Sequence, residues 1–294
     1  MSFTVAVLGL GAMGLPIATN LAKRFTVVGF DPFEDRRALG TTQGLNVTST
    51  ATEAAEGADV VLIAVRNAAQ LYAVLFGADG VVPVLEAGAS VILTSTVGSD
   101  AVEDAAARLA DVGIGLVDAP VSGGPVRAGE GDLLVTVGAT QHSWEHAKPV
   151  LDAMAGTLVL VGDVPGKGQA MKTVNQLLCG IHIAAAAEAL ALAGSLGLDQ
   201  RMVLDALMAG AAESFMLGNR GPRAIEAYEG DEPEVCSRLD IFVKDMGIVT
   251  AAAKSAGIAV PLAAAAEQLY ILGDAQGRGG DDDSTVIRIL SPQH

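Results

Sequence analysis

The 294-residue chain is poor in aromatic residues, which make up 4% of it, although hydrophobic residues make up 51%. Alanine, valine, leucine and isoleucine must therefore build the core, and so large a hydrophobic fraction excludes a disordered chain. The only cysteines are Cys179 and Cys236, too few for a disulfide framework, so a reducing, cytoplasmic compartment is expected. The four histidines form no ligand cluster with them, and we expect no metal site.

Basic residues are also scarce. The 18 lysines and arginines face 34 acidic residues, which gives a formal net charge of −16 and argues against nucleic acid and anionic membrane surfaces as partners. The longest apolar stretch, residues 181–196, carries His182 and Glu188 and is shorter than a membrane span. The chain enters a strand pattern at once, so we expect no signal peptide.

The first part of the chain alternates strand and helix patterns. Apolar, β-branched runs typical of buried strands lie at 3–8, 26–30, 59–65, 90–94, 115–118, 133–137 and 158–161. Helical patterns lie between most of them, and such alternation predicts a parallel, doubly wound α/β sheet of the Rossmann type.

After about residue 165 the strand patterns stop. Helical patterns follow at 169–197, 200–211, 217–229, 238–256 and 261–276. We therefore predict two domains, 1–165 and 166–294, of which the second is all-α and is entered by a long interdomain helix.

A glycine motif follows the first strand. Gly9, Gly11 and Gly14 form the pattern GxGxxG, with Ala12 and Met13 inside it, where the strand gives way to a helix. In a dinucleotide-binding turn these glycines allow the tight turn, the approach of a pyrophosphate and close packing of helix on strand. The alternative is a simple turn without a ligand.

Asp31 ends the second strand, seventeen residues after Gly14. A carboxylate there accepts hydrogen bonds from the adenosine ribose hydroxyls and repels a 2′-phosphate, which favours NAD over NADP. Arg36 and Arg37 lie nearby and could soften that preference. The alternative is that Asp31 caps a loop.

Three further motifs specify the reaction. They are DAPVSGG at 118–124, GQAMKTVNQ at 168–176 and FVKDMG at 242–247. Together with the glycine motif they resemble the β-hydroxyacid dehydrogenase family, which includes 3-hydroxyisobutyrate dehydrogenase and tartronate semialdehyde reductase. The stretches 67–70, 177–192, 240–247 and 282–290 are similar to four-carbon sugar-acid dehydrogenases of the threonate type.

The resemblance implies NAD-dependent oxidation of a short, anionic hydroxy acid, with hydride passing to nicotinamide. Lys172 would be the general acid/base, a role that a lysine can take where burial and nearby charge lower its pKa. The alternative is a lysine whose stem covers apolar surface while its ammonium reaches water. The turn at Ser122, Gly123 and Gly124 would bind the substrate carboxylate through backbone N–H groups and the hydroxyl; the alternative is a plain tight turn.

The family often has asparagine four residues after the lysine, where this chain has Gln176. Either Asn175 or Gln176 could therefore contact substrate, since both share the helix face of Lys172. The resemblance places Thr96 beside the nicotinamide ribose and Lys244 near the nicotinamide end of the cofactor and the substrate. Asn67, which follows the strand at 59–65, is expected to be a further cofactor contact. The alternative for Lys244 is a helix-surface lysine paired with Asp240, four residues before it.

Two other functions stay open from sequence alone. One is the reverse reaction, reduction of a semialdehyde acid such as tartronate semialdehyde. The other is a dinucleotide-binding module without catalysis. In either case the apolar helix expected at 169–196 presents more hydrophobic surface than one small domain needs, which predicts a homodimer or homotetramer.

Overall fold

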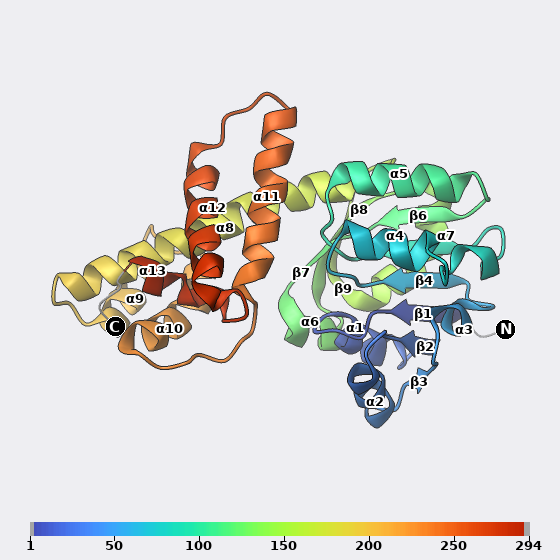
Figure 1. Cartoon of the computed structure of the whole chain (residues 1–294), viewed down its shortest axis with the longest axis horizontal. Helices are drawn as coiled ribbons and strands as arrows, with labels where there is room; N and C mark the ends of the chain where they lie inside the picture. The colour runs from blue at the N-terminus through green and yellow to red at the C-terminus, as the bar shows by residue number, and fades with distance from the viewer. Residues whose placement is uncertain (1–2, 291–294) are drawn as a thin grey trace. The chain divides into compact units, whose positions relative to one another are not determined.

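The computed structural model describes residues 3–290. The chain forms two compact units, which divide between Lys172 and Thr173 (Figure 1). The first is a sheet with helices and the second is almost entirely helical, so the predicted fold class is confirmed.

In the described residues the first unit holds a nine-stranded sheet of order β3-β2-β1-β4-β5-β6-β8-β7, with β9 paired to β8. The strands are β1 (Thr4–Leu8), β2 (Thr26–Phe30), β3 (Asn46–Val47), β4 (Val60–Ile63), β5 (Ser90–Leu93), β6 (Gly115–Asp118), β7 (Val121–Ser122), β8 (Leu133–Gly138) and β9 (Ala155–Gly162). From β3 to β6 all pairs are parallel, so these strands end at the same edge of the sheet.

The predicted parallel direction holds from β3 to β6 but not beyond β6. There β8 runs antiparallel to β6, with Asp118 opposite Gly138, and β7 runs antiparallel to β8. The connection from β6 to β8 contains only β7 and one short helix. Since no long crossover carries the chain back to the start of the sheet, β8 begins at the edge where β6 ends.

Helices cover both faces of this sheet. They are α1 (Gly14–Leu21), α2 (Glu34–Thr42), α3 (Ala51–Ala55), α4 (Ala68–Phe76), α5 (Ser99–Ala110), α6 (Gly124–Glu130), α7 (Gln141–Met154) and the 3-10 turn Val82–Val84. Neighbouring residues of one strand belong to opposite cores: Val60 and Leu62 pack in one, Val61 and Ile63 in the other. This two-sided burial explains why the strands read as continuous apolar runs.

The second unit packs helices around one apolar core. The helices are α8 (Lys167–Ser195), which begins in the first unit, α9 (Gln200–Met208), α10 (Phe215–Glu229), α11 (Leu239–Ser255), α12 (Pro261–Gly273) and α13 (Ile287–Leu290), with a π-helical turn Asp274–Arg278 and a 3-10 turn Asp283–Val286. By length and composition α8 is apolar enough to span a membrane, contrary to the sequence expectation. Its side chains Ile183, Ala187 and Leu190 are instead buried in this core, as in a central helix of a globular domain.

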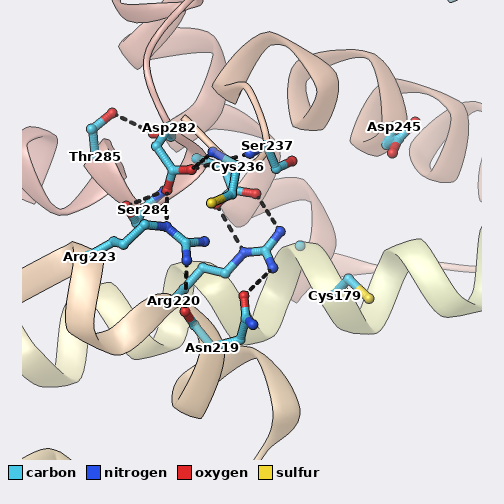
Figure 2. A network of polar contacts seen from close by, with 12 residues as sticks. Cys179, Asn219, Arg220, Arg223, Cys236, Ser237, Asp245, Asp282, Ser284 and Thr285 are labelled. Atoms are coloured by element: carbon cyan, nitrogen blue, oxygen red, sulfur yellow. Dashed lines mark hydrogen bonds and ion pairs between the residues drawn. The ribbon is translucent and has the colours of Figure 1, made fainter. Parts of the chain in front are cut away.

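Two ion pairs fix residues 282–283, at the start of the last 3-10 turn, to α10 (Figure 2). Arg220 pairs with Asp283 at 2.9 Å and Arg223 pairs with Asp282 at 3.0 Å, and both carboxylates are completely buried. Asp282 also caps the 3-10 turn by accepting from the Ser284 N–H. Burial raises the pKa of Asp283 despite its arginine partner. Burial acts in the same direction on Asp282, but the hydrogen bonds from Ser284 and Arg223 prevail and lower its pKa.

Candidate functional site

The glycine turn between β1 and α1 contains two glycines that packing requires and one glycine with open space beside it. Gly9 has φ +103°, and a Cβ there would lie 2.2 Å from the Ala64 carbonyl oxygen. A Cβ on Gly14 would lie 1.8 Å from the Gly9 carbonyl oxygen. A Cβ on Gly11, in contrast, would have no atom of residues 3–290 within 4 Å. Packing thus requires glycine at 9 and 14, and the open space at Gly11 fits the close approach of a pyrophosphate.

The helix after this turn starts later than its sequence pattern suggests. Ala12 and Met13 lie in the turn, and α1 begins at Gly14 with Met13 as its N-cap. No side chain caps this end. In the first turn of α1 the Leu15 and Ile17 N–H groups donate to the carbonyl oxygens of Gly11 and Met13, and Pro16 has no N–H. The positive end of the helix dipole still favours an anion beside this turn.

Asp31 follows β2 and is buried against the glycine turn. Its Oδ2 accepts from the Leu10 N–H at 2.8 Å and its Oδ1 accepts from the Phe33 N–H at 3.0 Å. Arg36 donates to the Leu10 carbonyl oxygen at 2.7 Å and Arg37 to that of Asp31 at 2.8 Å. Asp31 therefore does cap the loop. Since each carboxylate oxygen accepts more than one hydrogen bond, this role leaves acceptor capacity for ribose hydroxyls.

The ends of β4 and β5 hold the next two predicted residues. Asn67 is the N-cap of α4, and its Oδ1 accepts from the Gln70 N–H at 2.9 Å. Thr96 is half-buried and lies three residues beyond the end of β5, next to Ser95. The Ser95 hydroxyl accepts from the Val65 N–H at 2.8 Å and so ties the two strand ends together. Both predicted residues thus lie on segments that leave the carboxyl edge of the parallel strands.

Sequence reasoning gave no role to a buried clamp at the end of β6. The Asp118 Oδ2 accepts from the backbone N–H groups of Gly166 and Gln169, and its Oδ1 accepts from Gln169 Nε2 at 2.8 Å. The Gln169 Oε1 accepts from the N–H groups of Val97 and Gly98. We call these residues, Asp118 and Gln169, the clamp. It fixes the first turn of α8 to the ends of β5 and β6.

The clamp is buried in the first unit. Asp118 has no exposed surface, and burial raises its pKa although hydrogen bonds from Gln169, Gly166 and Gly168 to the carboxylate act in the opposite direction. Both residues belong to motifs that the sequence displays, DAPVSGG and GQAMKTVNQ. The sequence does show a polar residue, Asp118, at the end of a buried strand. Its partner Gln169 lies 51 positions away, so no local pattern identifies the pair.

The clamp places Lys172 one turn further along α8. Lys172 is 9% exposed, and its ammonium donates to the Ser122 hydroxyl at 2.7 Å. Gly123 and Gly124 follow with φ +140° and +76°, conformations that favour glycine. The structure therefore brings the predicted acid/base next to the predicted carboxylate anchor, and a hydroxy acid bound there would have both groups within reach.

The predicted residues of the second unit form a hydrogen-bonded chain. Asn175 Nδ2 donates to Gln176 Oε1 at 2.8 Å, and Gln176 Nε2 donates to Asp245 Oδ2 at 2.5 Å. Lys244 donates from its ammonium to Asp245 Oδ1 at 2.6 Å. Gln176 and Asp245 are buried, whereas Asn175 and Lys244 are half-buried. Asp245 was not among the predicted site residues, yet it joins two of them.

Comparison with known proteins identifies the family. Residues 4–162 match the family described as the NAD-binding domain of 6-phosphogluconate dehydrogenase, and residues 166–290 match the family described as NAD-binding of NADP-dependent 3-hydroxyisobutyrate dehydrogenase. The L-threonate dehydrogenase of Cupriavidus necator is 39% identical over 99% of this chain and 97% of its own.

Solved structures agree over the full length. A 3-hydroxyisobutyrate dehydrogenase from Salmonella typhimurium has a TM-score of 0.90 at 37% identity, over 98% of this chain and 99% of its own. The Mycobacterium tuberculosis 3-hydroxyisobutyrate dehydrogenase, solved with L-serine, has a TM-score of 0.85 at 29% identity, over 99% and 100%. The chain therefore belongs to the β-hydroxyacid dehydrogenase family of NAD(P)-dependent oxidoreductases, the family that its four motifs predict.

Proposed function

We propose that this hydroxy-acid dehydrogenase oxidises a four-carbon sugar acid such as threonate, with Lys172 as the general acid/base. The observation that carries the proposal is the 2.7 Å contact between the Lys172 ammonium and the Ser122 hydroxyl. This contact supports the proposal, because it would set the proton-transfer group beside the turn whose N–H groups would bind the substrate carboxylate. The resemblance to L-threonate dehydrogenases over nearly the whole chain supports the choice of acid.

The cofactor would lie along the carboxyl edge of the parallel strands. Gly9, Gly11, Ala12, Met13 and Gly14 would hold its pyrophosphate, and NAD supplies the hydride acceptor when bound. Asp31 would bind the adenosine ribose, Thr96 and Lys244 would lie at the nicotinamide end, and Asn67 would make a further contact with the cofactor. The Asp31 carboxylate supports NAD over NADP, because it would repel a 2′-phosphate.

The chain's own residues would divide the work on the substrate. Ser122 and the backbone N–H groups of Gly123 and Gly124 would bind the carboxylate and orient the C–H bond. Lys172, in its neutral form, would take the hydroxyl proton as the hydride leaves, and would return it in the reverse direction. Asn175 would bind a further polar group of the acid.

Replacing Lys172 tests this assignment. Lys172→Ala removes the proton acceptor, and Lys172→Arg keeps a positive charge on a group that does not deprotonate in proteins. We expect kcat to fall by about 10²- to 10⁴-fold in both variants, while the Kd for NAD changes less than about threefold. The matched control is Lys167→Ala, which removes an exposed lysine from the same helix. A kcat within tenfold of wild type in Lys172→Ala would contradict the role of Lys172.

We also propose that residues 1–165 form the NAD-binding domain and 166–294 the substrate and oligomerisation domain of a cytoplasmic homodimer or homotetramer. Neither cysteine forms a disulfide in the described chain, which supports a reducing compartment. Apolar side chains on α8 that are 43–67% exposed support a subunit contact; they are Met171, Val174, Leu178 and Leu192 along the helix, with Leu196 just after it. A monomer mass by light scattering at micromolar concentration would overturn the oligomer.

A further inference from the structure

Four residues of the second unit form one chain of donors and acceptors. The chain runs from Lys244 through Asp245 and Gln176 to Asn175, with each link between 2.5 and 2.8 Å. Asp245 is 3% exposed and Gln176 is 7% exposed, so water has little access to the two middle members. We call these four residues the relay.

The charges at one end fix the direction of every hydrogen bond in the relay. An ammonium can only donate, and a carboxylate can only accept, so Asp245 receives a bond at each of its oxygens. Gln176 must therefore turn its NH₂ toward Asp245, which leaves its carbonyl oxygen facing Asn175. Asn175 must in turn donate from its own NH₂, whose nitrogen also lies 3.4 Å from Cys179 Sγ.

This order leaves the Asn175 carbonyl oxygen as the outer end of the relay. A carbonyl oxygen accepts a hydrogen bond from a hydroxyl, but it repels a carboxylate and has no donor for it. We propose that Gln176 and Asp245 are positioning residues that present the Asn175 oxygen as an acceptor, so that the site selects an acid with an additional hydroxyl over one with an apolar substituent. This inference rests on the proposed function, in which Asn175 contacts the substrate.

The relay also accounts for glutamine at a position where the family often has asparagine. Gln176 must bridge Asn175 and Asp245, which lie on α8 and α11, and both ends of its amide are used in doing so. Of the two amides that could contact substrate, Asn175 is the half-buried one with an oxygen outside the relay, whereas Gln176 is buried. The structure therefore favours Asn175 as the contact and Gln176 as its support.

The variant Asp245→Asn reverses the relay. The introduced asparagine turns its oxygen toward the Lys244 ammonium and its NH₂ toward Gln176. Gln176 then has to rotate its amide by half a turn, and Asn175 must follow in order to accept from it. The outer end of the relay becomes an NH₂ group, which no longer accepts from a substrate hydroxyl.

A second variant restores the original direction. When Gln176→Glu is combined with Asp245→Asn, the carboxylate moves to position 176 and the amide to position 245. The new carboxylate accepts from the amide at 245 on one oxygen and from Asn175 Nδ2 on the other. Asn175 again presents its oxygen outward, and the net charge of the relay is unchanged.

The readout is the ratio of kcat/KM for L-threonate to kcat/KM for 3-hydroxyisobutyrate, both with NAD. We expect a ratio above one in wild type, a fall of about tenfold in Asp245→Asn and recovery to within about threefold in the double variant. Glu188→Gln is the matched control, because it removes an exposed carboxylate from α8 outside the relay, and its ratio should equal that of wild type. Circular dichroism melting and NAD titration verify that each variant is folded.

The outcomes separate this inference from the proposed function. A wild type that oxidises neither acid overturns the proposed function and the inference with it. An active wild type whose ratio stays within twofold in Asp245→Asn, or is not recovered in the double variant, overturns the relay alone. If Asp245→Asn does not fold, Gln176→Met interrupts the relay without altering the Lys244–Asp245 ion pair, and an unchanged ratio there overturns it too.

Discussion

Two aspartate–glutamine pairs lie along α8, and they are built differently. Gln169 and Gln176 are seven residues apart, and each donates its amide nitrogen to a buried carboxylate, Asp118 in the first unit and Asp245 in the second. The other donors to Asp118 are backbone N–H groups, whereas Asp245 receives a lysine ammonium. The first pair therefore holds backbone segments together, and the second orients a side chain. The role of an aspartate–glutamine pair therefore depends on the other groups that donate to the aspartate, which are backbone N–H groups for Asp118 and the Lys244 ammonium for Asp245.

If Asp118 holds backbone segments together, its replacement should lower the stability of the protein. Asp118→Asn leaves one oxygen for the two backbone donors and turns an NH₂ group against the Gln169 amide nitrogen, so that two buried donors face each other. We expect the free energy of unfolding to fall by about 2 kcal/mol, measured by urea unfolding at pH 7. Asp152→Asn, which removes an exposed carboxylate paired with Lys148, should cost less than about 0.5 kcal/mol. Equal losses in the two variants would contradict the clamp.

The glycine turn extends the contrast between residues that hold the fold and residues that meet a ligand. Gly11→Ala should leave the melting temperature unchanged, because its Cβ would enter open space, but weaken NAD binding by about tenfold or more. Gly129→Ala is the matched control, since its Cβ would make only an ordinary contact with Pro16 at 3.7 Å. Fluorescence titration with NAD gives the Kd. Unchanged affinity in Gly11→Ala would remove the pyrophosphate from this turn.

Asp31 is another buried carboxylate, and we propose that it both caps a loop and recognises the cofactor. Asp31→Asn removes the charge that opposes a 2′-phosphate, so the ratio of kcat/KM with NAD to that with NADP should fall by about fivefold. Glu34→Gln, an exposed acid at the start of α2, is the control. A wild type with equal kcat/KM for the two cofactors would remove the proposed role.

The smallest expected effect is a pH dependence of stability. Burial raises the pKa of Asp118 above its ordinary 3.8. Between pH 3.8 and the raised pKa, the native state therefore keeps a proton that the unfolded chain has released. The contribution of Asp118 to stability therefore falls as pH rises from about 3.8 to the raised pKa and is constant above it. The difference in unfolding free energy between wild type and Asp118→Asn should shrink over that window.

Asp282 should show the opposite pH dependence of stability. Its pKa is lowered, so its stabilising contribution is complete above about 3.8 and is lost as pH falls through the lowered value. The difference between wild type and Asp282→Asn should therefore grow as pH rises. Urea unfolding at several acidic pH values measures both differences. The same sign for the two variants would contradict the assigned shifts.

Local sequence patterns predict the fold class well because burial on both faces leaves continuous apolar strands, as in β4. They fail for β7 and the reversal of β8, where the sheet direction depends on a short connection rather than on apolar periodicity. The glycine turn follows from one motif of adjacent residues. The Lys172–Ser122 contact joins two motifs 50 residues apart, and the family resemblance, not a local pattern, predicts that both belong to one site. The clamp and the relay join positions 51 and 69 residues apart, and no local pattern shows which acid meets which amide.

The most direct test of the account is NADH formation at 340 nm with a panel of short acids. The wild-type protein should be offered threonate, erythronate, glycerate and 3-hydroxyisobutyrate, each with NAD and with NADP. We expect the protein to reduce NAD, with the highest kcat/KM for a four-carbon polyhydroxy acid. A protein that binds NAD but reduces it with none of these acids would contradict the central claim.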